Sequence, residues 1–356
     1  MRVINDITKQ LLRTGALLLA LFLPSAAMAG EAGTDGEEVN VQKIIFDHMS
    51  DAYEWHLWGH THLPLPVIVK HHEGGWEVFS SSRFHESADG TYNGFYIDPE
   101  RKDKVYEQGY DDRPWDISIT KDVVQIWINI LVLLLIFIPC ARWYKKRRAE
   151  GSHSAPKGFK GAVEMLTMYI HDDVIKACIG EKHYRPYAPY LLTVFFFIFV
   201  TNLMGLIPVF PGGSNVTGNL SITMLLAVFT FLLVNIFGSK EYWKEILWPD
   251  VPMMMKCPVP LMPVVEIIGI FTKPFALMMR LFANMFGGHT VILSLTCLIF
   301  ITFKVSVGMG TSMTLVSFLM LIFMNCLELL VAFLQAYVFT MLSSVYIGLA
   351  HPSHHK

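Results

Sequence analysis

The fold of this chain is decided by the apolar stretch from Pro260 to Phe303, PLMPVVEIIGIFTKPFALMMRLFANMFGGHTVILSLTCLIFITF, and by a second one from Thr311 to Ala350. As a helix, each stretch would be about 60 Å long at 1.5 Å per residue, roughly twice the hydrocarbon thickness of a bilayer. Neither can stand upright as a simple span. We therefore predict two strongly tilted membrane helices that pair as a hairpin, with the connecting turn around Gly308 and Gly310.

The composition outside this hairpin also belongs to a membrane protein, with 53% hydrophobic residues and a mean hydropathy of +0.42. Further apolar segments predict spans at Val123–Tyr144, Pro189–Phe210 and Leu220–Phe237, and an amphipathic pattern predicts an interfacial helix over 159–182. The expected fold class is an all-α polytopic membrane protein with about five transmembrane or membrane-embedded helices. Residues 121–356 form its membrane domain, and residues 259–350 form the hairpin.

The N-terminal part predicts an exported segment. Residues 1–29 have the basic, apolar and small-residue regions of a signal peptide, with cleavage before Gly30; an uncleaved anchor helix is the alternative. Residues 30–120 are polar and aromatic, with strand-like stretches at Pro66–Lys70 and Trp76–Ser80, so we expect a small β-containing domain. A basic cluster follows the first span at once and should stay in the cytoplasm. The mature N-terminus is therefore expected outside and the C-terminus inside.

The charges of the exported segment limit what it binds. Residues 31–120 hold 18 Asp and Glu against 7 Lys and Arg, which gives no reason to expect nucleic acid as a partner. The segment also holds seven of the 14 histidines. These could bind a metal, but they lack a recognisable ligand spacing, and solvated surface histidines are the favoured interpretation, so no metal site is predicted. All five cysteines follow residue 120, so the exported segment cannot form disulfides of its own.

Ionisable residues within the hairpin are the candidates for function, because a charge at bilayer depth costs several kcal/mol unless it is paired or hydrated. Lys273 and Lys304 lie near helix ends, where a long side chain can reach the interface. Four residues cannot reach the interface in this way: Glu266, Arg280, His289 and Glu328.

Their order along the hairpin predicts different depths. Glu266 should be nearest the cytoplasm, Arg280 near the middle, and His289 with Glu328 nearer the outside. Arginine keeps its proton in proteins, whereas Glu and His can exchange theirs. Titratable groups on both sides of a permanent charge predict two proton half-paths separated by an electrostatic gate. The alternative is a buried Arg–Glu pair that only holds the hairpin together.

Two other classes of membrane protein are less compatible with the sequence. An ion-coupled secondary transporter would be expected to show an internal repeat or broken helices around a substrate site, and no repeat stands out. An intramembrane metalloprotease would need a His-Glu-x-x-His helix to hold zinc, and that motif is missing from the sequence.

Three stretches carry a resemblance to a known family. The stretch KPFALMMRLFANM, Lys273–Met285, resembles the signature of the a subunit of F-type ATP synthase, the stator channel beside the rotating c ring. The stretches Asn202–Pro208 and Leu334–Phe339 are similar to two further motifs of that family. The similarity covers about residues 120 to 350.

The resemblance implies a role for each candidate residue. Arg280 would be the essential arginine that faces the carboxylate of the c ring, with Asn284 and Gln335 as polar neighbours along the path. Glu266 would belong to the cytoplasmic half-channel.

His289 and Glu328 would form the pair of the outer half-channel. Their order is swapped relative to the common bacterial pattern and is similar to mitochondrial versions. The swap leaves open which of the two groups takes the proton first.

The resemblance also implies the setting of the protein. A proton-channel subunit does no covalent chemistry and needs no cofactor, and its expected partners are the c-ring subunits, the b-subunit peripheral stalk, the F1 sector and the lipid bilayer. The expected location is the bacterial inner membrane. The exported segment exceeds the family's usual plan, so the resemblance assigns it no function.

The first prediction concerns processing. The mature protein should begin near Gly30, because the apolar run before the small-residue site is too short to span a bilayer. N-terminal sequencing of the purified protein is the check. A start at Met1, or a cytoplasmic location for a tag placed near residue 80, would contradict it.

Overall fold

The computed structural model describes residues 50–58, 61–87, 89–98, 101, 103–151, 156–207, 211–247 and 261–351. The predicted signal peptide lies outside these residues. The chain divides into two compact units: unit 1 comprises Met1–Ile128, Leu203–Val216 and Phe286–Leu329, and unit 2 comprises Asn129–Asn202, Thr217–Met285 and Leu330–Lys356. Each unit thus combines segments that are far apart in the sequence.

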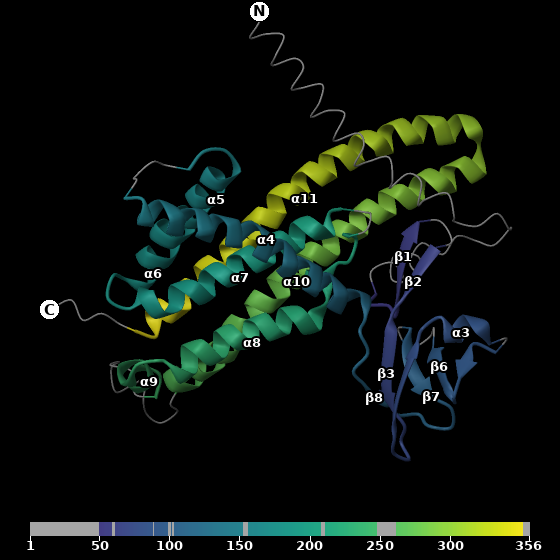
Figure 1. Cartoon of the computed structure of the whole chain (residues 1–356), viewed down its shortest axis with the longest axis horizontal. Helices are drawn as coiled ribbons and strands as arrows, with labels where there is room; N and C mark the ends of the chain where they lie inside the picture. The colour runs from purple at the N-terminus through teal and green to yellow at the C-terminus, as the bar shows by residue number, and fades with distance from the viewer. Residues whose placement is uncertain are drawn as a thin grey trace, which may run out of the picture. The chain divides into compact units, whose positions relative to one another are not determined.

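The N-terminal part of unit 1 is a small β-rich domain, which we call the strand domain (residues 50–120; Figure 1). It holds a two-stranded sheet β1-β2, a sheet of order β4-β3-β8 and a sheet of order β5-β6-β7, with one short helix α3. The elements are β1 (Glu54–Trp58), β2 (Thr61–Pro64), β3 (Pro66–Lys70), β4 (Trp76–Ser80), α3 (Arg83–Glu86), β5 (Thr91–Tyr92), β6 (Phe95–Asp98), β7 (Lys104–Glu107) and β8 (Trp115–Asp116).

The core of the strand domain follows from the alternation of its strands. Side chains of a strand point alternately to its two faces, and in β3 the fully buried residues are Val67 and Val69. They pack with Phe79, Phe95 and other apolar residues in one cluster. The two strands predicted from the sequence, Pro66–Lys70 and Trp76–Ser80, are confirmed with the same bounds.

Two histidines of the strand domain, His71 and His72, are paired with glutamates. His71 places its Nδ1 2.7 Å from Glu107 Oε1 and its Nε2 3.0 Å from Glu77 Oε2, and His72 Nδ1 lies 2.7 Å from Glu107 Oε2. The described residues contain no group of three or more His, Cys, Asp or Glu side chains that could hold a metal ion. The side chains of His71 and His72 stay 28% and 24% exposed, and glutamates on β4 and β7 pair with their rings.

These contacts shift the pKa values of both partners. The hydrogen bond to Glu107, opposed by burial and aided by Glu77, raises the pKa of His71. Burial opposes ionisation of Glu107, but hydrogen bonds from the His72 backbone and from both rings outweigh it and lower the pKa of Glu107 to about 2. The cluster is therefore most favourable when His71 is charged and Glu107 is ionised.

The second prediction follows from these shifts. The His71 contribution is fully present below its ordinary pKa of 6.5 and is lost as the pH rises through the raised value. The Glu107 contribution is present above 4.5 and is lost as the pH falls toward about 2. Hydrogen exchange of the β3 and β7 amides in the full-length protein, corrected for intrinsic rates, should therefore show greater protection at about pH 5.5 than at about pH 8.

Glu107→Gln should lower that protection by roughly 1.5–3 kcal/mol at the lower pH and flatten the pH dependence. Glu86→Gln is the matched control, because the Glu86 side chain is 61% exposed and pairs only with the neighbouring Arg83 in the same helix. Equal effects of the two substitutions would contradict the assignment.

The remaining elements are helical, as predicted for the membrane part. They are α4 (Lys121–Ala149), α5 (Phe159–Met168), the π-helical η3 (Tyr169–Lys176), α6 (Ala177–Ile179), α7 (Tyr184–Gly205), the short 3-10 turn η4 (Val216–Gly218), α8 (Leu220–Ile236), α9 (Lys240–Leu247), α10 (Leu261–Val305) and α11 (Val307–Leu349).

Four of the described helices combine enough length and apolar character to cross a membrane: Lys121–Ala149, Tyr184–Gly205, Val264–Ile299 and Gly310–Leu349. The apolar α8 is shorter, at 17 residues. A polytopic helical protein with a β-containing N-terminal region agrees with the predicted fold class.

In unit 2, α7 forms the centre of the core. The most apolar segment of α7 is 56% buried, whereas the corresponding segments of α4, α10 and α11 are 17% or less buried. Fully buried Leu191, Phe195 and Ile198 recur along α7 at helical spacing. The helix begins at Tyr184 rather than at the predicted Pro189, because a proline is tolerated in the first turns of a helix.

The segment predicted as one interfacial helix, 159–182, contains a π-helical stretch, η3. A π-helix has more residues per turn than an α-helix, so it changes which residues share a face. Ile170, Val174 and Ile175 are all buried in η3, and they join the same core as α7. The segment is therefore part of the packed core of unit 2 rather than only an interfacial helix.

The turn between the two long helices was predicted in the wrong place. A single residue, Ser306, separates α10 from α11, and both Gly308 and Gly310 lie within α11. Helical hydrogen bonding continues on both sides of the break, from Ser306 N–H to Thr302 and from Gly310 N–H to Ser306. These two bonds pair backbone groups that would lack a hydrogen-bond partner in a wider turn.

Candidate functional site

The six candidate residues lie on the two long helices. Glu266, Arg280, Asn284 and His289 belong to α10, and Glu328 and Gln335 belong to α11. The structure brings Asn284 and Gln335 together in unit 2, and it brings His289 and Glu328 together in unit 1.

Asn284 and Gln335 join the two helices in unit 2. The Asn284 amide donates a hydrogen bond of 2.7 Å to Gln335 Oε1, and Gln335 is 1% exposed. A buried amide needs such a partner, since an unsatisfied one costs about 1–3 kcal/mol. The bond fixes the polar end of Asn284 one helical turn from Arg280.

A second polar contact holds α11 to α7. Asn202 is fully buried, and its amide donates to the Ala332 carbonyl at 3.3 Å and accepts from Thr217 Oγ1 at 2.8 Å. Ala332 lies one turn before Gln335 on α11. In the sequence Asn202 is visible only as part of a motif, whereas in the structure its contact positions the helix that carries Gln335.

Among the candidates, Glu266 and His289 are half-buried and Glu328 and Gln335 are buried, whereas Asn284 and Arg280 are exposed. Arg280 is the charged one of the two. Ala276 and Ala283, one turn before and after it, are exposed as well, so the arginine is flanked by small side chains. Among the residues that the structure describes, no carboxylate forms an ion pair with its guanidinium. The alternative of a buried Arg–Glu pair that holds the hairpin together is therefore wrong.

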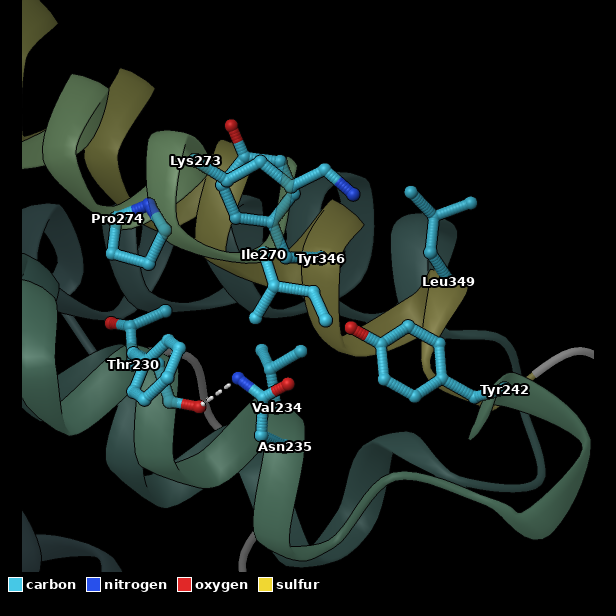
Figure 2. A pocket seen from close by; sticks show the side chains of 10 residues that line it. Thr230, Val234, Asn235, Tyr242, Ile270, Lys273, Pro274, Tyr346 and Leu349 are labelled. Carbon is cyan, nitrogen blue, oxygen red and sulfur yellow. Dashed lines mark hydrogen bonds between the residues drawn. The ribbon is translucent and has the colours of Figure 1, made fainter. Parts of the chain in front are cut away.

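Glu266 is half-buried near a tyrosine of α9. Burial of the Tyr242 hydroxyl and the negative charge of Glu266 raise the pKa of Tyr242. Tyr242 also lines a pocket between α8, α9, α10 and α11 (Figure 2). The pocket is lined by Thr230, Phe231, Val234, Asn235, Tyr242, Ile270, Lys273, Pro274, Tyr346 and Leu349.

Lys273 is held at this pocket by an aromatic ring. Its Nζ lies 5.8 Å from the centroid of the Tyr346 ring, a cation–π contact that Figure 2 shows at the upper part of the pocket. The sequence placed Lys273 near a helix end, where its side chain can reach the membrane interface. The contact gives its charge a partner within unit 2.

In unit 1 the His289–Glu328 pair is close and buried. His289 Nε2 lies 3.8 Å from Glu328 Oε1, with side chains that are 17% and 3% exposed. This separation is too long for a hydrogen bond. Gly205 approaches the pair, since a Cβ there would lie 3.6 Å from His289 Nε2.

A further carboxylate of unit 1 was missed by the sequence analysis. Asp122, in the first turn of α4, is 6% exposed and accepts a hydrogen bond from Ser214 Oγ. Its backbone N–H donates to Asp51 Oδ1 at 3.2 Å. Burial and the Asp122 charge raise the pKa of Asp51. Asp122 directly precedes the predicted span Val123–Tyr144, and a carboxylate at that position is the signal that could have found it.

Comparison with known proteins agrees with the geometry. The sequence model of the family described as ATP synthase A chain matches residues 123–348, and a model described only as a domain of unknown function matches residues 44–122.

Individual relatives point to the same family. The chain is 36% identical over 359 residues to ATP synthase subunit a of Chlorobium phaeobacteroides (strain DSM 266), which covers 97% of this chain and 94% of the relative. It is 44% identical over 250 residues to ATP synthase subunit a of Pelodictyon phaeoclathratiforme, which covers 68% of each chain.

The third prediction uses two neighbouring glycines of α10. A Cβ added at Gly288 would lie 2.6 Å from Glu328 Oε1, whereas at Gly287 it would meet no atom within 4 Å. Both changes favour the helix by about 1 kcal/mol. Gly288→Ala must move the Glu328 carboxylate away, so it should lower proton flux through membrane vesicles by on the order of tenfold or more.

Gly287→Ala is the matched control and should leave the flux near the wild-type level. Equal losses in both variants, or no loss in either, would contradict a role for the geometry of the His289–Glu328 pair.

Proposed function

The chain belongs to the ATP synthase A chain family, and on that premise we propose that it is the proton-channel subunit of an F-type ATP synthase, with Arg280 as the charge that separates two half-channels. The observation that carries this proposal is the exposed Arg280 on an apolar helix, with no carboxylate of the described residues paired to it. A guanidinium at bilayer depth needs a partner. A carboxylate on a neighbouring subunit supplies one.

The surroundings of Arg280 suit the approach of another helix. Ala276 and Ala283 are exposed beside it, and small residues let helix backbones come close together within a membrane. We assign this surface to the c-ring subunits.

The outer half-channel is assigned to His289 and Glu328. Both groups can exchange a proton, and their separation of 3.8 Å lets them share one after a small rotation. Asp122 and Ser214 belong to the same unit and extend the set of polar side chains toward the strand domain. Protons would enter by this route and neutralise the carboxylate of the c ring.

The inner half-channel is assigned to Glu266, with Tyr242 beside it. The half-buried carboxylate and the tyrosine that lines the neighbouring pocket provide exchangeable groups where the proton would leave. Asn284 and Gln335 would line the interface next to Arg280 through their mutual hydrogen bond. Arg280 would block a direct leak, because its charge is permanent and repels a proton between the half-channels.

The setting follows from this assignment. The chain would do no covalent chemistry and would work with the c ring, the b-subunit stalk and the F1 sector in the bacterial inner membrane. A signal peptide over residues 1–29 would place the N-terminus and the strand domain outside. The basic cluster in the last turns of α4 would stay in the cytoplasm, and the C-terminus would lie inside. The family relationship favours this function over a secondary transporter.

The fourth prediction tests the charge of Arg280. Arg280→Ala should leave the complex assembled, abolish ATP synthesis and allow passive proton leak, because the electrostatic barrier is gone while the path remains. Arg280→Lys should substitute poorly, since an ammonium lacks the planar fork of guanidinium and releases a proton more readily. The measurements are proton flux in vesicles stripped of F1 and ATP synthesis in intact vesicles.

Met279→Ala is the matched control, because Met279 neighbours Arg280 and is exposed but carries no charge. It should retain most of the synthesis. Normal synthesis in Arg280→Ala would overturn the mechanism, and failure of that variant to assemble would indicate a structural role for the arginine.

A further inference from the structure

The strand domain exposes one apolar sheet face. In the sheet β4-β3-β8 the register pairs Ile68 with Val78 and Lys70 with both Trp76 and Trp115, so these side chains share a face. The chain continues from β8 along the edge of β3, where the Ile117 N–H donates to the Ile68 carbonyl. The large exposed side chains of this face are Trp76 (54%), Val78 (66%), Trp115 (75%) and Ile117 (61%).

The acidic side chains of these strands lie on the other face of the sheet. The acidic residues of β4 and β8, Glu77 and Asp116, pair with Val69 on β3, so they lie on the opposite side of the sheet. There Glu77 contacts His71, and Asp116 accepts from Tyr53 at 2.5 Å. The strands therefore present apolar and aromatic side chains together with the basic Lys70, although residues 31–120 are strongly acidic.

The sheet is tied to the first membrane helix. After Ile117, the Ile119 N–H donates to the Pro66 carbonyl at 3.1 Å, and the Lys121 N–H donates to the Ala52 carbonyl at 2.9 Å. The strand domain thus holds the chain up to the first residue of α4. These bonds keep the sheet near the end of the span, because four residues at most separate β8 from the helix.

Trp127 indicates that the bilayer surface lies close to the start of α4. It is 57% exposed on α4, six residues after the helix begins, which corresponds to about 9 Å along the helix. Tryptophan gathers at the membrane–water interface because its ring is apolar and its N–H is polar. The apolar sheet face and this tryptophan both belong to unit 1.

We propose that the face formed by Trp76, Val78, Trp115 and Ile117 lies on the outer leaflet of the bilayer, with its side chains in the headgroup and upper acyl region. An exposed patch of this kind marks an interaction surface, and its two tryptophans, branched aliphatic residues and lysine match the chemistry of a lipid interface. The domain then anchors the start of α4 at the membrane surface.

The test places an environment-sensitive fluorophore at Val78→Cys in the full-length protein, with the five native cysteines replaced by serine and the protein reconstituted in phospholipid vesicles. Quenchers are supplied either on the lipid chains near the headgroup or as iodide in the water. Asp111→Cys is the matched control, because the Asp111 side chain is 99% exposed and lies outside this face.

The label at position 78 should lose most of its emission to the lipid quencher and little to iodide, and the label at position 111 should do the reverse. A second label, at Ile117→Cys, should behave like the first. Iodide quenching at both face positions would show a face in water, and shielding from both quenchers would show a protein partner; either result overturns the proposal. The readout does not depend on proton transport, so it stands apart from the proposed function.

Discussion

A charge that cannot be neutralised has to be met by another group when its helix lies in hydrocarbon, and the rest of this membrane protein is organised around that requirement. Arg280 is exposed on α10 and has no carboxylate partner among the described residues of its own chain. Within the chain, Asn284 is hydrogen-bonded to Gln335, and His289 lies 3.8 Å from Glu328. On the function proposed above, the partner of Arg280 is a carboxylate of another subunit.

The polar pairs of the long helices differ in their contacts and therefore in their roles. Asn202 and Gln335 are buried and hydrogen-bonded to neighbouring helices, so they fix positions: one ties α7 to α11 and the other ties α11 to α10. His289 and Glu328 approach each other without a hydrogen bond between them. A loose pair of this kind suits proton exchange, because a tightly satisfied one would hold its proton in a single arrangement.

In the strand domain, too, charged side chains are paired with one another. The buried Glu107 pairs with His71 and His72. The domain's outward face on the β4-β3-β8 sheet is left apolar. Backbone hydrogen bonds carry this domain directly into α4, so an addition to the usual family plan is built onto the helix rather than attached by a free linker.

The sequence by itself determined the membrane class, the two long apolar helices, the strands β3 and β4, and the family motif around Arg280, because these depend on local hydrophobic patterns and on a run of specific residues. It also predicted which residues carry exchangeable protons.

Only the tertiary structure decided which groups meet. The Asn284–Gln335 bond, the 3.8 Å approach of His289 and Glu328, and the contact of Asp122 with Ser214 each join residues more than 30 positions apart in the sequence. The single-residue break at Ser306 and the π-helical η3 likewise came from backbone hydrogen bonding that no local pattern shows. Contacts of this kind depend on how helices pack side by side, and helix packing is set by all the neighbouring side chains together.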